Sequence, residues 1–438
     1  MQPHFNPVAE LAEFAPVELA ARARLREGFA FFDSARDMGA SEPMSMLAIE
    51  PECWLEGDLF APADFERLRR TVSQLSKEAA PLGDGVTGPI LGGAIGYDGC
   101  YCFGLYRHVL VYRHREGAWY ASSNWWQSLL AGAPPVARLN GALRFRPVLE
   151  GEAFCARVRR AQAYISSGDI YQVNLSYPFE AAWPGGETWA FYEALRRCSP
   201  APYGAFVQQP KRSILSTSPE LFLKFSGRNV QTRPIKGTRP RHSEISADEQ
   251  NARELLTSPK EIAELVMITD LERNDLGQFC EWGSVRVSEL LKLERHEQVF
   301  HLVSTVEGRM REDVDVVSAL RECFPGGSIT GAPKRRAREI IKELEGQDRG
   351  LYTGALGWFG ANGESVFNIL IRTVVVEGGQ AHFHVGAGVV ADSIPKAEWQ
   401  ETRDKATGIL WASESVAKKK PNAGAASGSS IATPAEQC

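Results

Sequence analysis

The sequence lacks the features that mark membrane, secreted and nucleic-acid-binding proteins. No apolar run is long enough to span a bilayer, and the aromatic run at residues 29–32 is far too short. The N-terminus carries no secretory signal. The net charge of −5 is small for 438 residues, so it gives no global case for nucleic acid or a membrane surface. We therefore expect a cytoplasmic protein that binds neither.

Cysteine motifs are missing as well. The eight cysteines are scattered, and none forms a Cys-x-x-Cys pair. Cys100 and Cys102 have no second pair that would complete a zinc site. No cysteine stands in the Gly-x-Cys-x-Gly setting of a glutaminase nucleophile. We expect reduced, mostly buried thiols.

The composition is that of a globular protein, with 44% hydrophobic and 24% charged residues. Apolar spacing and composition predict helices at residues 17–27, 62–79, 152–167, 188–198, 248–271, 313–324, 333–345 and 395–413. Strand-like runs lie at residues 29–34, 88–99, 109–112, 118–121, 170–176, 203–231, 352–360, 366–376 and 380–390. The residues from 417 onward are rich in Lys, Ala, Gly and Ser without periodicity, which predicts a disordered tail.

The stretch Arg-Pro-Ile-Lys-Gly-Thr-Arg-Pro-Arg at residues 233–241 gathers three arginines and one lysine. Its prolines and glycine disfavour a helix or a central strand, so we expect a rigid loop. Neighbouring positive charges disfavour the protonated form of Lys236 and would depress the pKa of its amine. A neutral amine is a nucleophile. A solvated basic loop is the alternative for a stretch of this composition.

Two segments carry glutamates three residues apart, Glu261 with Glu264 and Glu398 with Glu401. Residues at this spacing share one face of a helix. Two such pairs facing one cavity would offer the oxygen ligands that Mg²⁺ takes together with waters and anionic substrate oxygens. The same pattern is abundant on solvated helix faces, which is the alternative interpretation.

Three turns could hold or protonate an anionic ligand. The loop at residues 326–334 runs into a helix whose amides and dipole could bind a carboxylate, or it could simply begin that helix. The segment Gly-Ala-Gly at residues 386–388 could present backbone amides to an anion, although a β-bulge would explain it as well. Glu220 follows a Ser-Pro turn and would serve as a general acid if burial raised its pKa; a plain turn carboxylate is the alternative.

Two polar side chains interrupt apolar runs. His301 lies within Val-Phe-His-Leu-Val, where a satisfied core histidine is more common than a catalyst. Arg372 interrupts the strand-like run at residues 366–376. A charge in such a strand needs a partner, either a carboxylate of the protein or one of a ligand.

Taken in chain order, these segments resemble the chorismate-utilising enzymes. The motifs that carry the resemblance are Pro-Ile-Lys-Gly-Thr-Arg-Pro-Arg (234–241), Asp-Leu-Glu-Arg-Asn-Asp-Leu-Gly (270–277), His-Leu-Val-Ser-Thr-Val (301–306), Phe-Pro-Gly-Gly-Ser-Ile-Thr-Gly-Ala-Pro-Lys (324–334) and Gly-Ala-Gly-Val-Val-Ala-Asp-Ser (386–393). The resemblance implies an α+β fold in which two antiparallel β-sheets pack face to face, with helices outside and an active-site cleft between the sheets. It also divides the chain into an integrated N-terminal region (1–145), a chorismate-binding catalytic region (146–416) and a tail (417–438).

The resemblance further implies roles for individual residues. Glu264 and Glu401 would be the principal ligands of a Mg²⁺ cofactor, with Glu261 and Glu398 at or near the ion. Glu220 would be the general acid that protonates the departing 4-hydroxyl of chorismate. The positions matched to substrate binding are Thr238, His301, Thr330, Tyr352, Arg372, Gly386, Ala387, Gly388 and Lys405. Ser34 matches a residue near a tryptophan pocket in this family, with a plain turn serine as the alternative.

Two positions separate the branches of the family. Relatives that form isochorismate or salicylate carry a water-activating lysine where this chain has Gln172. Anthranilate synthases typically have alanine at the position of Lys236, whereas the aminodeoxychorismate branch has lysine. The resemblance therefore implies amination of chorismate at C4 through a covalent intermediate on Lys236. The product would be 4-amino-4-deoxychorismate, the precursor of p-aminobenzoate and so of folate.

Ammonia would have to come from another protein, since the sequence holds no glutaminase nucleophile. We expect a separate glutamine amidotransferase subunit and, because no lyase fits after residue 417, another enzyme for aromatisation. One alternative is an anthranilate synthase component I, which makes anthranilate and pyruvate. The other is a non-catalytic chorismate- or tryptophan-binding scaffold for an amidotransferase. The presence of all four glutamates with Glu220 and Lys236 argues against the scaffold.

Overall fold

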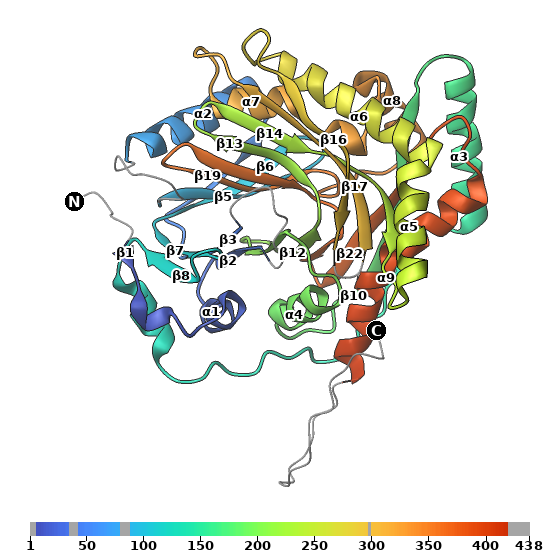
Figure 1. Cartoon of the computed structure of the whole chain (residues 1–438). Helices are drawn as coiled ribbons and strands as arrows, with labels where there is room; N and C mark the ends of the chain where they lie inside the picture. Colours follow the sequence, from blue (N-terminus) through green and yellow to red (C-terminus); the bar gives the residue numbers. More distant parts are fainter. Residues whose placement is uncertain (1–5, 35–42, 79–87, 297–298, 419–438) are drawn as a thin grey trace.

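The computed structural model describes residues 6–34, 43–78, 88–296 and 299–418. Two β-sheets lie one above the other, and helices pack against their outer faces (Figure 1). Strand pairs within the described residues are antiparallel. The predicted fold of two face-to-face antiparallel sheets with outer helices is confirmed; the cleft between them stays a prediction.

The first sheet, sheet A, combines strands from both ends of the chain. Its order is β1 (Asn6–Pro7), β8 (Ala118–Ala121), β7 (His108–Arg113), β3 (Met44–Ile49), β2 (Ala30–Asp33), β11 (Tyr203–Gln208), β12 (Arg212–Ser218), β21 (Thr373–Glu377), β22 (Gln380–Val389), β10 (Gln172–Ala182) and β18 (Gly331–Ala332), with β9 (Arg146–Pro147) beside β10.

The second sheet, sheet B, has the order β15 (Ile235–Pro240), β17 (Val299–Arg309), β14 (Asn229–Arg233), β13 (Leu221–Ser226), β20 (Glu364–Ile369), β19 (Ala355–Gly360), β5 (Ile90–Ile95), β6 (Cys100–Tyr106) and β4 (Trp54–Asp58), with β16 (Arg286–Arg295) beside β17. N-terminal strands thus belong to both sheets. The region boundaries at residues 145 and 416 stay a prediction.

The helices are α1 (Pro16–Ala23), α2 (Pro62–Lys77), α3 (Gly151–Ser166), α4 (Thr188–Cys198), α5 (Ile245–Thr257), α6 (Pro259–Gly277), α7 (Val316–Cys323), α8 (Lys334–Glu345) and α9 (Pro395–Lys418), with short 3₁₀ helices η1 (Ala9–Leu11), η2 (Asn124–Leu130) and η3 (Gly327–Ile329). The predicted helix at residues 248–271 is two helices. Ser258 caps α6 by accepting from the Glu261 amide, and Pro259 cannot continue α5.

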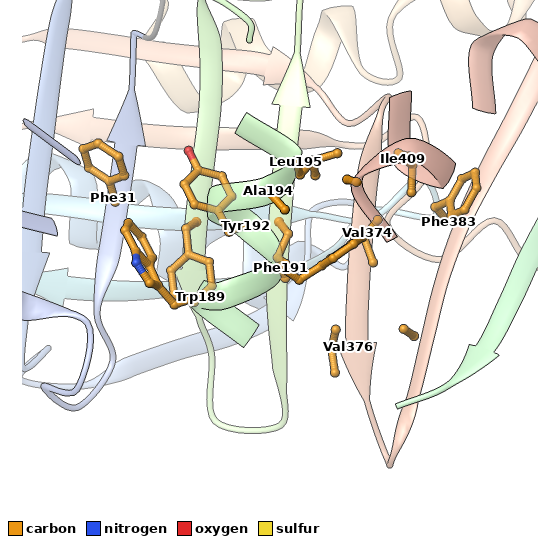
Figure 2. Close-up of a cluster of buried hydrophobic side chains, with 14 of the residues drawn as sticks. Phe31, Trp189, Phe191, Tyr192, Ala194, Leu195, Val374, Val376, Phe383 and Ile409 are labelled. Carbon is orange, nitrogen blue, oxygen red and sulfur yellow. The ribbon is translucent and has the colours of Figure 1, made fainter. Parts of the chain in front are cut away.

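Apolar side chains form a layer on each side of both sheets. Between the sheets, residues such as Phe32 and Ile214 of sheet A pack with Ile90 and Trp358 of sheet B. On the outer face of sheet A, α4 contributes Trp189 and Phe191 to a buried cluster (Figure 2). Burial of apolar area on this scale is the main force that holds the layers together.

The chain changes sheets at two places that matter for the site. It passes from β12 to β13 through Ser218-Pro219-Glu220, and from β20 to β21 through residues 370–372. The Ile369 amide donates to the Glu220 carbonyl (3.1 Å), and the Thr217 amide donates to the Arg372 carbonyl (3.1 Å). The strand predicted at residues 366–376 is therefore two strands in different sheets, and Arg372 lies in the corner between them.

The last helix continues beyond its predicted end. Helix α9 reaches Lys418, so the predicted tail begins inside it, and residues 419–438 lie outside the described residues. Within the described part, no helix is both long enough and apolar enough to cross a bilayer. The seven cysteines described are free thiols, and four of them are buried.

Candidate active site

The basic stretch around Lys236 is an edge strand, so the prediction of a loop was wrong. Residues 235–240 form β15, which continues β14 along β17. In the described residues β15 pairs with β17 alone, and its free edge tolerates the prolines that a central strand would exclude. Gly237 has a φ of +71° at a shift of register between Lys236 and Thr238, which a bulge with glycine explains.

Each arginine of this stretch lies beside a carboxylate. The expectation that the arginines crowd Lys236 is therefore corrected. Arg233 is buried and binds Glu294. Arg239 lies 3.7 Å from Glu261. Arg241 makes several hydrogen bonds with Asp248, at 2.8 to 3.1 Å. The positive charges of these arginines are therefore balanced by their own carboxylates.

Lys236 and Glu220 are joined through one residue of the 326–330 loop. The Lys236 Nζ donates to the Ser328 carbonyl (3.2 Å), and the Ser328 hydroxyl donates to Glu220 Oε1 (2.6 Å). Burial raises the pKa of Glu220, although the Ser328 hydrogen bond and the charge of Lys236 oppose the shift. A carboxyl with a raised pKa and an amine thus lie on either side of one serine, which suits acid-assisted nucleophilic attack.

The two glutamate pairs meet at the same site, one from α6 and one from α9. Lys260 Nζ lies 3.0 Å from Glu398 Oε1 and 3.9 Å from Glu264 Oε1. Burial raises the pKa of Glu264 despite the nearby Lys236 charge. At Glu401 burial opposes ionisation, but the charge of Lys405 prevails and lowers the pKa.

These carboxylates fit a divalent cation that keeps most of its waters. Glu264 Oε1 and Glu398 Oε2 are buried without a hydrogen-bond partner, which marks two oxygens available to an ion. No three carboxylate, histidine or cysteine groups of the described chain form a ready cage. Mg²⁺ does not require one, because it is commonly held by one or two carboxylates, waters and substrate oxygens.

Glycines of β22 form another wall of the site. Residues 380–389 pair with β10 in continuous register, so the segment at 386–388 is regular strand and not a bulge. A Cβ on Gly388 would lie 2.5 Å from Gln172 Nε2 and 3.8 Å from Lys236 Nζ. A Cβ on Gly386 would lie 2.8 Å from Tyr352 Oη. A side chain at either position would therefore displace residues of the site.

Lys405 ties this wall to α9. Its Nζ donates to the Gly386 carbonyl (3.0 Å) and lies 2.7 Å from Glu401 Oε1. The side chains of Lys405 and Glu401 remain 43% and 45% exposed, so both stay accessible to a ligand. In an antiparallel ladder, the amide of a residue points to the same side as its carbonyl, so the Gly386 N–H also faces Lys405 and not β10.

The chain matches the family described as chorismate binding enzyme over residues 95–410. This range contains all of the sequence motifs that carry the resemblance. The chain is a member of the chorismate-binding enzymes. It is 47% identical over 255 residues to aminodeoxychorismate synthase component 1 of Bacillus subtilis (strain 168), covering 58% of this chain and 54% of that one. It is 46% identical over 259 residues to anthranilate synthase component 1 1 of Haloarcula marismortui, covering 59% and 53%.

A solved structure of this chorismate-binding family has the same fold. The crystal structure of anthranilate synthase component I from Streptococcus pneumoniae TIGR4 matches with a TM-score of 0.73 and 28% identity, over 86% of this chain and 93% of that chain. The chain spans about half the length of the curated relatives that it matches. Relatives named for two different reactions are equally similar, so identity alone does not select the product.

The structure also describes the other positions predicted for the site. Thr238 stands opposite His301 in the β15–β17 ladder, and His301 is buried with its ring edge-on to His296. Arg372 is half-buried in the sheet-to-sheet corner with a φ of +49°. Thr330 is fully buried and its hydroxyl donates to the Gly326 carbonyl (2.9 Å), which shapes the loop; its predicted role in substrate binding stays a prediction. Ala387 is a buried ladder residue.

Ser34 is separate from this group. It lines a cavity of about 80 Å³ together with Tyr203, Lys224, Trp358 and Asn368. Its hydroxyl donates to the Pro202 carbonyl (3.2 Å). This hydrogen bond joins two segments that are far apart in the sequence, and the pocket and turn interpretations of Ser34 both stay predictions.

Two residues of the site escaped the sequence reasoning. Ser328 lay within a quoted motif but was not singled out, since a hydroxyl in a glycine-rich loop has no distinctive spacing. Lys260 precedes Glu264 by four residues on α6, a spacing at which opposite charges meet on a helix. That signal was available in the sequence.

A second buried acidic group lies behind the 326–330 loop. Glu272 and Asp275 of α6 are both buried, and Lys334 Nζ lies 2.6 Å from Asp275 Oδ2. Burial, reinforced by the charge of Asp275, raises the pKa of Glu272 to about 8. Its Oε1 lies 3.2 Å from where a Cβ on Gly327 would be, directly under the loop.

Glu272→Gln should therefore change the pH dependence of stability. A raised folded-state pKa means that the stability contributed by the protonated carboxyl is complete below about pH 4.5 and is lost as pH rises through about 8. We expect equal melting temperatures for variant and parent at pH 5, and a variant that melts several degrees higher at pH 8.5. Thermal unfolding across pH measures this. Asp270→Asn, an exposed change on the same helix, is the control; parallel curves for Glu272→Gln and parent would refute the prediction.

Proposed function

We propose that this chain is the chorismate-aminating component of an aminodeoxychorismate synthase, which converts chorismate and ammonia to 4-amino-4-deoxychorismate. The observation that carries the proposal is the Lys236–Ser328–Glu220 connection at the site. Covalent C4 amination requires an amine and an acid, and here a lysine amine and a buried carboxyl both hydrogen-bond to the same serine. The substitution of alanine for such a lysine would leave no nucleophile of this kind.

The reaction balances with these two groups. In its deprotonated form the Lys236 amine attacks C2 of chorismate, both ring double bonds shift, and the C4–oxygen bond breaks as Glu220 gives its proton, which releases water. Ammonia then attacks C4, both double bonds shift back, and the C2–nitrogen bond breaks to free the lysine. The new C4 ammonium returns a proton to the Glu220 carboxylate. The sum is chorismate plus ammonia giving aminodeoxychorismate plus water.

Magnesium would be held by Glu264 and Glu401, with Glu261 and Glu398 close by. When bound, the ion supplies positive charge that attracts a substrate carboxylate and neutralises the glutamates. Lys405, Arg372 and the Gly386 amide would bind the remaining anionic oxygens of a dicarboxylate. Tyr352 would line the ring beside them.

Gln172 supports ammonia over water as the incoming nucleophile. It is buried, and a Cβ on Gly388 would lie 2.5 Å from its Nε2. An amide cannot take a proton from water near neutral pH, so addition of water at C2 lacks a base here. Ammonia needs no such activation.

We propose that ammonia reaches the site from a separate glutamine amidotransferase, and that the cavity at Ser34 takes a tryptophan-like amino acid. Lys224 and Asn368 on the cavity wall offer donors for a carboxylate, and Trp358 offers an apolar surface. Direct binding of tryptophan, measured by calorimetry with Ser34→Ala as the comparison, tests the second idea.

Product identification tests the main proposal. Chorismate, Mg²⁺ and an ammonium salt at pH 8 should give 4-amino-4-deoxychorismate, and a chelator should stop the reaction. Anthranilate with pyruvate would instead establish an anthranilate synthase component I, the alternative favoured by the equally similar relatives of that name. Failure to turn over chorismate with either ammonia or a cognate glutaminase would point to a non-catalytic scaffold.

A further inference from the structure

Arg349 makes the most complete set of hydrogen bonds near the site. It is 3% exposed and lies in the connection between α8 and β19. Its guanidinium donates to both carboxylate oxygens of Glu345 (2.7 and 2.9 Å), the Ile329 carbonyl (3.1 Å), the Thr353 hydroxyl (3.1 Å) and the Asn174 carbonyl (2.6 Å). A guanidinium has five N–H donors, and five acceptors surround this one.

The acceptors belong to four separate segments of the chain. Asn174 lies on β10 opposite Gly388, and Ile329 follows Ser328 in the loop that contacts Lys236 and Glu220. Glu345 ends α8 and accepts from both the amide and the hydroxyl of Ser176 (2.7 and 2.9 Å). One buried cation therefore fixes strand β10 beside the glycines of β22, the 326–330 loop and the end of α8 relative to one another.

The fourth segment carries Tyr352. Thr353 has a φ of +62°, a strained conformation for a β-branched residue that persists only where neighbours enforce it. Its hydroxyl accepts from Arg349 and donates to the Tyr352 carbonyl (2.6 Å). The Tyr352 ring stacks on His384, with centroids 5.2 Å apart and planes at 15°, and a Cβ on Gly386 would lie 2.8 Å from the tyrosine hydroxyl. The strained backbone at Thr353 therefore helps to set the orientation of the Tyr352 side chain.

We propose that Arg349 is a positioning residue for the substrate pocket. Through Thr353 it holds Tyr352 against the Gly386 wall, and through Ile329 it sets the loop that carries Ser328. This inference rests on the proposed site but not on the identity of the product, because every reaction considered begins with chorismate binding. Arg349 itself is buried by its partners and acts through them.

Arg349→Lys tests the idea while keeping the buried charge. A lysine is a point donor and cannot serve five acceptors in a planar fork, so we expect chorismate to bind at least tenfold more weakly and KM to rise more than kcat falls. Arg157→Lys is the matched control, since Arg157 donates to the backbone carbonyl of the same Glu345 (3.3 Å) and to no part of the pocket. Unchanged chorismate affinity in a folded Arg349→Lys protein would overturn the proposal.

A second pair of variants keeps the proposal testable if Arg349→Lys does not fold. Thr353→Ala and Thr353→Ser both lose the methyl group, but only serine keeps the hydroxyl that links Arg349 to Tyr352. We expect the alanine variant to bind chorismate about fivefold or more weakly, and the serine variant to bind it like the parent. Binding is measured by calorimetry with Mg²⁺ and without ammonia. Equal affinities for the two variants would refute the link, whatever product the enzyme makes.

Discussion

Lys236→Ala is expected to reduce amination of chorismate by a factor of about 10³ or more, because it removes the nucleophile of the first covalent step. Chorismate binding should change by less than about threefold, since the groups proposed to hold its carboxylates lie on α9, β22 and the corner at Arg372. The charge of Lys236 also lowers the pKa of Glu220 and opposes burial at Glu264. Its removal raises the pKa of Glu264 further and also removes the repulsion between the lysine charge and Mg²⁺. Calorimetry measures the net change in Mg²⁺ affinity.

Lys292→Ala is the control for this change. Lys292 is a half-exposed residue of β16 in the same sheet, and its ion-pair partner is Glu289, which is not one of the four glutamates of the site. It should leave the rate unchanged. A Lys236→Ala protein that still made aminodeoxychorismate at near-parental rate would exclude the covalent route and return the choice of product to the family level. Mass spectrometry of the parent with chorismate and no ammonia would look for the adduct directly.

Periodicity predicted most of the helices because their buried faces are local features. In α2, the apolar residues Phe65, Leu68, Val72 and Leu75 are the ones that the structure buries. The errors arose where tertiary context decides. Residues 235–240 have loop-like composition, yet the exposed edge of β17 gives them ladder partners that composition does not reveal. Arg372 looked like an interruption of one strand because a sheet change leaves no periodic mark in the sequence.

The site itself was predictable in its members but not in its geometry. The two glutamate pairs were visible from their spacing, but their meeting depends on how α6 and α9 pack. The pairing of each arginine in 233–241 with its own carboxylate comes from residues up to 61 positions away, such as Glu294. Local charge counting therefore overstated the cationic field at Lys236. Arg349 carried no motif in the sequence reasoning, and its importance appears only when its five acceptors are seen together.

Glu220→Gln is expected to lower kcat by about 10² to 10⁴, because glutamine cannot protonate the departing 4-hydroxyl. Burial raises the pKa of Glu220, so the parent keeps its acid form above the usual carboxylate range and loses it as pH rises through that raised pKa. The alkaline loss of kcat that this titration causes should disappear in the variant. A pH–rate profile over pH 5 to 9 for both proteins measures it. Glu249→Gln, an exposed change at the Arg295 pair, should keep the parental profile.

Stability separates a chemical effect from an unfolded protein in this experiment. A carboxyl whose folded-state pKa is raised favours the native state below the ordinary pKa and loses that contribution as pH rises. Glutamine removes the cost of ionising a buried group and can still accept from the Ser328 hydroxyl, so Glu220→Gln should melt no lower than the parent at pH 8. A stable variant with a parental rate would show that Glu220 is a structural carboxylate. A stable variant that is slow at every pH would identify it as the acid that expels the hydroxyl.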